Sequence, residues 1–124
     1  MPERLQEAFG ASRVLSPQKG LRSFVALVRH RALAQPDRTG FLFLRDNNPE
    51  NDFDLFSYSQ LDTKARAIAA VLQQSGELGQ RVLLLHQPGI DFVTAFYGCL
   101  YAGAIAVTTY PAHRGRLKQS LPKI

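Results

Sequence analysis

The fold is decided by the stretch RVLLLHQPGIDFVTAFYGCLYAGAIAVTTY, which spans residues 81–110. Its beginning, RVLLLH, is a continuous apolar run without alternation, and such a run predicts a parallel strand that is covered on both faces. The tripeptide QPG then breaks the strand, and residues 90–104 are apolar on nearly every side of a predicted helix. The segment IAVTTY returns as a second strand. Because strand–helix–strand crossovers are right-handed, the two strands are predicted to be parallel neighbours in a βαβ unit.

One side of this predicted helix consists of small residues, along which another element can approach closely. Those residues are Ala95, Gly98, Cys99, Ala102 and Gly103. A helix that is apolar all round needs cover from both sides, and the 124 residues supply only two other predicted helices. The stretch therefore indicates the beginning of a larger α/β domain.

Upstream of this unit, the sequence predicts a helix followed by two strands. The helix spans residues 23–35, and Pro36 stops it. Its apolar positions at helical spacing are Phe24, Leu27, Val28 and Ala32. The strands GFLFLRD and FDLFSY are joined by the polar turn NNPEND. Because this connection is short, the strands are predicted to pair antiparallel.

The clearest helix of the sequence begins near Ser59, where SQLD offers a hydroxyl cap followed by an acidic residue three positions later. Gly76 supplies its stop. The apolar face of this helix comprises Leu61, Ala65, Ile68, Ala69 and Leu72. Offsets of 4, 7, 8 and 11 from the first of these place them along one side of an amphipathic helix.

The order of these elements predicts an α/β fold with a mixed sheet, built from an antiparallel strand pair and a βαβ unit. Residues 1–20 contain two prolines and two glycines without a sustained apolar period, so we interpret them as an N-terminal extension. Residues 21–112 form the predicted partial subdomain. We expect residues 113–124 to form a basic tail that leads toward a missing remainder.

Composition and charge exclude several classes of protein. The net charge of +5 is concentrated at the two ends of the chain, and the tail HRGRLK has no aromatic residue to stack on bases, so nucleic acid is not the expected partner. No apolar run is long enough to span a membrane, and the N-terminus does not resemble a signal peptide. We expect a cytoplasmic protein. The single cysteine, Cys99, is interpreted as a buried apolar residue.

The residues that could carry chemistry do not form a recognisable active site. The three histidines, His30, His86 and His113, lie in separate predicted elements, although His86 ends a strand, where ligand sites of α/β proteins tend to lie. The acidic turn with Glu50, Asp52 and Asp54 lacks the glycine and terminal carboxylate of a calcium loop. No glycine-rich loop enters a helix as a phosphate loop would. We therefore assign no catalytic, cofactor-binding or metal-binding residue in this chain.

Three stretches together resemble the N-terminal part of the acyl-adenylate-forming superfamily, also called AMP-dependent synthetases and ligases. FSYSQLDTKARAIAAVLQ looks like the first core motif of these enzymes, and LYAGAIAVTTYP looks like the second. The segment between them, from GQRVLLLHQPGIDF onward, is similar to the fatty acyl-AMP ligases in particular. The resemblance covers about residues 22–116.

The motif residues that the resemblance marks are scaffold positions. They are Phe56, Ser57, Tyr58, Leu61, Leu100, Ala102, Gly103, Tyr110 and Pro111. Two positions depart from the family pattern, since Thr108 and Ala112 stand where the family usually has proline. The phosphate loop, the magnesium-binding glutamate, the ribose-binding aspartate and the catalytic lysine of the family all belong downstream of these motifs.

The resemblance implies an N-terminal scaffold fragment of a fatty acyl-AMP ligase, truncated before the catalytic motifs. The complete enzyme would activate a fatty acid with ATP and Mg²⁺ to acyl-AMP and transfer it to an acyl carrier protein in polyketide or lipopeptide synthesis. Its implied partners are the remainder of the adenylation domain and the carrier protein. We expect the fragment alone to be inactive and to hold no cofactor.

The alternative is a non-catalytic interaction or dimerisation module, in which the apolar helix and the open sheet edge dock onto a partner or a second copy. A small nucleic-acid module is a distant third hypothesis.

Overall fold

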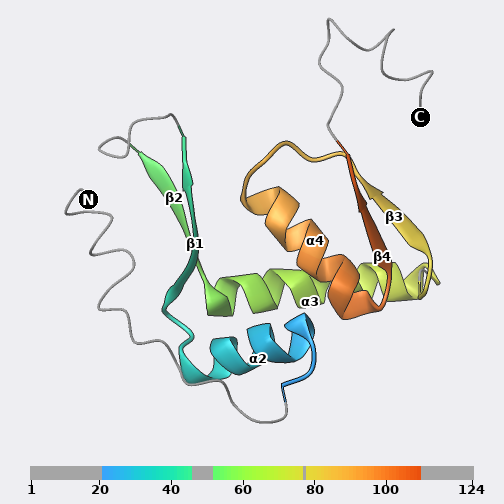
Figure 1. Ribbon diagram of the computed structural model, residues 1–124, viewed down its shortest axis with the longest axis horizontal. Coiled ribbons are helices and arrows are strands. Elements are labelled where there is room, and N and C mark those ends of the chain that lie inside the picture. The colour runs from blue at the N-terminus through green and yellow to red at the C-terminus, as the bar shows by residue number, and fades with distance from the viewer. Residues whose placement is uncertain (1–20, 46–51, 77, 110–124) are drawn as a thin grey trace, which may run out of the picture.

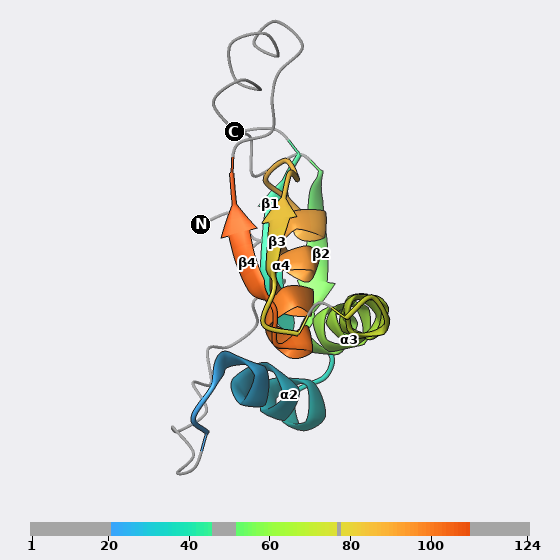
Figure 2. The ribbon, with the colours of Figure 1, turned by 90° about the vertical axis from the view of Figure 1, so that its right-hand side faces the viewer.

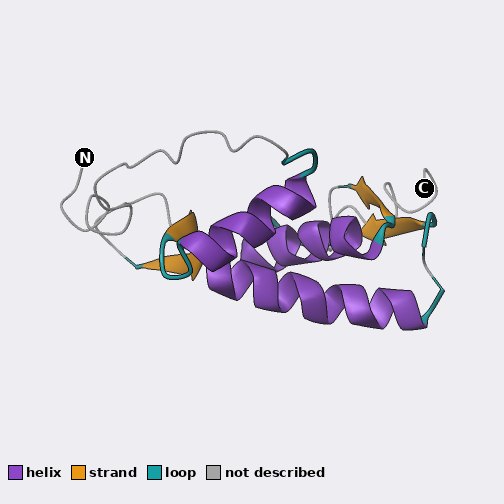
Figure 3. Cartoon of the chain, turned by 90° about the horizontal axis from the view of Figure 1, so that it is seen from below, coloured by secondary structure: helices purple, strands orange, loops and turns teal. Residues whose placement is uncertain are grey.

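A computed structural model describes residues 21–45, 52–76 and 78–109 of the chain. Three helices form a layer, and a pair of strands lies at each end of that layer (Figures 1 and 3). The predicted N-terminal extension, most of the NNPEND turn and the basic tail lie outside the described residues. Among the described residues, no helix combines the length and apolarity that crossing a bilayer requires.

The first part of the chain is helix α2 (Phe24–Ala34) followed by the strands β1 (Thr39–Leu44) and β2 (Phe53–Ser57). Ser23 caps α2, because its hydroxyl accepts a hydrogen bond from the backbone N–H of Ala26. The two strands pair antiparallel, as the short connection predicted. The helix is therefore where the sequence placed it, but its buried face is narrower than predicted. Val28 and Ala32 are buried, whereas the side of Phe24 and Leu27 is exposed.

Helix α3 (Tyr58–Gln74) is the longest described element, and it begins earlier than the sequence predicted. Its cap is Ser57 rather than Ser59. The Ser57 hydroxyl accepts a hydrogen bond from the backbone N–H of Gln60, and the Gln60 side chain accepts one from the backbone N–H of Ser57. This reciprocal capping box satisfies two backbone donors at once, which explains why Ser57 is preferred to Ser59.

The remaining elements, β3 (Arg81–Leu84), α4 (Ile90–Ala102) and β4 (Ile105–Thr108), form the predicted βαβ unit. The two strands are parallel, with Leu83 opposite Val107 in the register. Figure 1 shows α4 between this pair and the β1–β2 pair, with α3 running beneath both. The α/β class and both kinds of strand pairing are confirmed. Among the described residues, however, the pairs form two separate two-stranded sheets and not one mixed sheet.

The core lies mainly between α3, α4 and the inner face of the β3–β4 pair. One cluster consists of Ala69, Leu84, Ala95, Cys99, Ala102 and Ala104. A second, smaller cluster joins α2, β2 and α3 through Val28, Phe56 and Leu61. Most members of the larger cluster are small, so its burial depends on close approach of the backbones more than on bulky side chains.

The first strand of the βαβ unit is covered on one face only by the described residues, as the small number of predicted helices implied. Leu84 is buried against the α4 side, but Leu83 is 45% exposed. In the partner strand Ile105, which shares a face with Leu83, is 52% exposed. Figure 2 shows the reason: the helices lie on one side of the β3–β4 pair. We call the other side, formed by Leu83, Ile105 and Val107, the outer face.

Candidate functional site

The most closely fitted part of the molecule is the contact between α3 and α4. Gly98 lies against Ile68, and a Cβ added at Gly98 would stand 2.5 Å from the Cγ2 atom of Ile68 and 2.7 Å from its Cβ. No side chain fits in that space without a shift. The small-residue side predicted for this helix is therefore its contact face, and it sets how near the two helix axes lie.

Cys99 is buried in the same contact and behaves as the sequence predicted. Only 1% of the residue is exposed. Burial raises the pKa of its thiol, so the neutral form is favoured and the thiolate nucleophile is not.

A polar link between α3 and α4 was missed by the sequence analysis. The hydroxyl of Tyr101 donates a hydrogen bond to the Oδ1 atom of Asp62 over 2.8 Å, and Arg66 approaches the other carboxylate oxygen at 3.9 Å. Burial, followed by the hydrogen bond and the charge of Asp62, raises the pKa of Tyr101 well above its usual range. The pair lies 39 residues apart in the chain, and only the i, i+4 spacing of Asp62 and Arg66 is a sequence signal.

The end of α4 turns into β4 at Gly103, which adopts the left-handed conformation with φ of 75°. Its carbonyl accepts a hydrogen bond from the backbone N–H of Gly79, just before β3. A Cβ at Gly103 would also stand 2.6 Å from the Cδ1 atom of Leu78. The left-handed backbone angle therefore favours glycine at position 103, and the exposed end of the Leu78 side chain would have to shift to admit a Cβ.

The other described motif residues lie in the core or at the ends of elements. Phe56 and Leu61 are buried, and the ammonium of Lys64 lies 5.4 Å from the centre of the Phe56 ring. The backbone N–H of Tyr58 donates to the carbonyl of Arg38 at 3.0 Å. Leu100 is half-buried and its carbonyl accepts a hydrogen bond from Gly103. Ala102 is buried, whereas Tyr110 and Pro111 lie outside the described residues.

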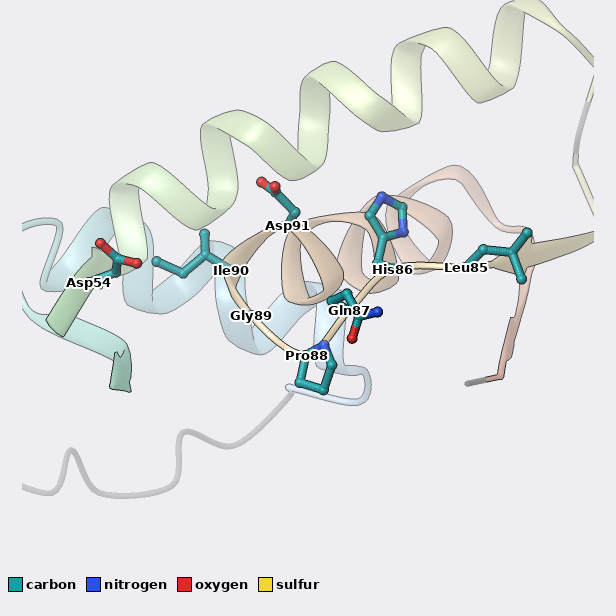
Figure 4. A pocket seen from close by; sticks show the side chains of 8 residues that line it. All are labelled: Asp54, Leu85, His86, Gln87, Pro88, Gly89, Ile90 and Asp91. Carbon is teal, nitrogen blue, oxygen red and sulfur yellow. The ribbon is translucent and has the colours of Figure 1, made fainter. Parts of the chain in front are cut away.

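The described residues also form a shallow, open cleft of about 590 Å³ after the carboxyl end of β3. Figure 4 shows its lining, which consists of Asp54 from β2 and residues 85–91 from the loop and the start of α4. His86 lies here, as its position at a strand end predicted, and its side chain is exposed.

The charged groups around this cleft are paired or face solvent. Asp54 accepts a hydrogen bond of 2.7 Å from Arg45, which also pairs with Asp52 at 3.4 Å, and these carboxylates raise the pKa of Arg45. Asp91 lies in the first turn of α4, where the helix dipole stabilises a negative charge.

No group of three or more metal-binding side chains occurs among the described residues. His30 is half-buried in α2, away from the cleft, and Glu50 and His113 lie outside the described part of the chain.

Comparison with known proteins places this chain among AMP-binding enzymes. Residues 28–118 match the family of AMP-binding enzymes. The chain is 39% identical over 102 residues to a medium-chain-fatty-acid–[acyl-carrier-protein] ligase of Moorena producens, which covers 82% of this chain and 17% of that protein. It is 42% identical over 100 residues to the human Disco-interacting protein 2 homolog B, covering 79% of this chain and 6% of the human protein.

A solved structure agrees with these relatives. The fatty acyl-adenylate ligase of Legionella pneumophila, determined in complex with acyl adenylate and pyrophosphate, superposes with a TM-score of 0.70 at 45% sequence identity. The superposition covers 77% of this chain and 17% of that one. The chain thus spans about a sixth of the length of the ligases that it matches, or less.

Proposed function

The chain belongs to the family of AMP-binding enzymes, and from that premise we propose that it forms the N-terminal scaffold of a fatty acyl-AMP ligase. The complete enzyme would join a fatty acid to AMP from ATP, release pyrophosphate and pass the acyl group to the thiol of an acyl carrier protein. The ligase relatives support this proposal, because they match over most of the chain.

The observation that carries the proposal is the combination of a tight helix contact with an open outer face. Gly98 against Ile68 fixes α4 on α3, and Gly103 directs the chain into β4. On the opposite side of the strands, the outer face leaves aliphatic side chains in contact with water. Parallel strands are ordinarily covered on both faces, so this arrangement suits a scaffold whose second layer is supplied by the rest of the enzyme.

In this proposal the described residues position other groups and do not perform the chemistry. Acyl adenylation needs cations or a metal to stabilise charge on the phosphates during attack by the carboxylate. The described part of the chain offers neither a cluster of metal ligands nor a cationic cradle at the cleft. We propose, on the family resemblance, that the remainder of the adenylation domain binds ATP and Mg²⁺ and that the chain alone is inactive.

A chimera tests the proposal. Residues 22–109 would replace the matching segment of the Legionella pneumophila ligase, and fatty-acid-dependent exchange of pyrophosphate into ATP would be measured. We expect exchange by the chimera and none by the 124-residue chain. A folded but inactive chimera would contradict the shared scaffold, and exchange by the chain alone would contradict the assignment of the chemistry to other residues.

The chimera also allows a matched pair of variants. Gly98→Leu adds a side chain where a single Cβ already meets Ile68, and it should abolish most of the exchange together with folding of the subdomain. Ala70→Leu makes a similar addition on the exposed side of α3 and should leave exchange unchanged. Equal effects of the two substitutions would show that the α3–α4 contact is not what the enzyme needs.

A second candidate function is favoured by the outer face itself. An isolated chain with Leu83 and Ile105 half exposed could act as a non-catalytic module that docks onto a second copy. Light scattering distinguishes the two candidates, because a concentration-dependent dimer of the isolated chain supports docking and a monomer at all concentrations opposes it.

A further inference from the structure

We draw no further inference here: the strongest candidate, the apolar outer face of the β3–β4 pair with Leu83 and Ile105, already belongs to the two candidate functions above, and nothing in the structure shows what else covers it.

Discussion

At the scale of single residues, Gly98 is the described glycine at which an added side chain would be most crowded. Glycine in a helix interior usually costs stability relative to alanine, by about 1 kcal/mol. Glycine is nevertheless favoured at position 98, because a Cβ there would stand 2.5 Å from the Cγ2 atom of Ile68. The local preference of the helix and the packing of the core thus oppose each other at this residue, and packing prevails.

This opposition gives a first prediction. Gly98→Ala should lower the free energy of unfolding by about 1 kcal/mol, because overpacking of about 1–3 kcal/mol exceeds the gain in helix propensity. Urea unfolding of the full chain measures this change in the free energy of unfolding. In an Ile68→Ala background the cost of Gly98→Ala should shrink in part, since the 2.5 Å contact to Cγ2 is removed while the 2.7 Å contact to Cβ remains. Stabilisation by Gly98→Ala in the parent chain would contradict the close approach.

A second residue-scale prediction concerns the Tyr101–Asp62 hydrogen bond. Tyr101→Phe removes the donor from a carboxylate whose side chain is only 14% exposed. We expect a loss of about 1.5–3 kcal/mol in the free energy of unfolding, as is typical for hydrogen bonds to charged groups. Denaturant unfolding at pH 7 measures the loss, and Tyr97→Phe serves as a control that leaves this bond intact.

The same bond predicts how stability depends on pH. The pKa of Tyr101 is raised in the folded chain above its ordinary value of 10.0, so the folded state favours the neutral phenol. The contribution to stability is complete below about pH 10 and is lost as the pH rises beyond it, because the unfolded chain ionises first. Above pH 10, the urea concentration at the midpoint of unfolding should therefore fall less steeply with rising pH in Tyr101→Phe than in the parent chain. Identical slopes in the two proteins would rule out this tyrosine as the cause.

At the scale of elements, the start of α3 shows how nearly the sequence predicts a helix end. Two serines, Ser57 and Ser59, stand two residues apart, and each has a polar residue three positions later. The sequence signal favoured Ser59 with an acidic partner, whereas the structure uses Ser57 with Gln60. The choice depends on where β2 ends, because Ser57 closes that strand and keeps the extended backbone that a cap requires.

The two serines make a matched pair for a third prediction. Ser57→Ala removes the hydroxyl that accepts from the backbone N–H of Gln60 and should cost about 1 kcal/mol of unfolding free energy. Ser59→Ala removes a hydroxyl with no capping role and should change it by less than about 0.5 kcal/mol. Thermal unfolding of both variants measures the difference. A larger loss of unfolding free energy in Ser59→Ala than in Ser57→Ala would show that Ser59 is the helix cap, as the sequence predicted.

Other elements followed from the sequence because their signals are local. Helical spacing of Leu61, Ala65 and Ala69 identified the buried face of α3, and the small residues of α4 identified its contact face. The Tyr101–Asp62 bond could not be predicted, because it joins positions 39 residues apart and no local pattern marks it. The cleft after β3 was anticipated only through the position of His86 at a strand end.

At the scale of the whole molecule, the main difference from the sequence-based prediction is the cover of the strands. Apolarity of Leu83 predicted a buried side chain, yet it remains 45% exposed, because every described helix lies on the other side of its strand. A sequence reports the environment that each residue prefers. The small number of predicted helices was the signal that this cover would be incomplete in the 124 residues.

The outer face gives a fourth prediction. Replacing both Leu83 and Ile105 with threonine should reduce binding of an apolar dye by the isolated chain and leave its unfolding free energy within about 0.5 kcal/mol. The same pair in the ligase chimera should lower its melting temperature, because there the face would be covered. Val71→Thr, at a 62% exposed position on α3, is the control and should change neither protein's stability. An unchanged melting temperature of the doubly substituted chimera would contradict the proposed cover.

The arrangement of the strand pairs has a consequence for the way such a protein is made. Each described strand pairs with the next strand along the chain, β1 with β2 and β3 with β4, so the described sheets need no distant sequence to form. The antiparallel contacts of β1 with β2 are local and form quickly, whereas the parallel pair of β3 and β4 needs the whole of α4 between them and forms more slowly. Domains begin to fold from their N-terminal side during synthesis. In the ligase proposed above, this part of the chain would form its own strand pairs before the residues downstream of it were added. During that interval the aliphatic side chains of Leu83 and Ile105 on the outer face would remain in contact with water.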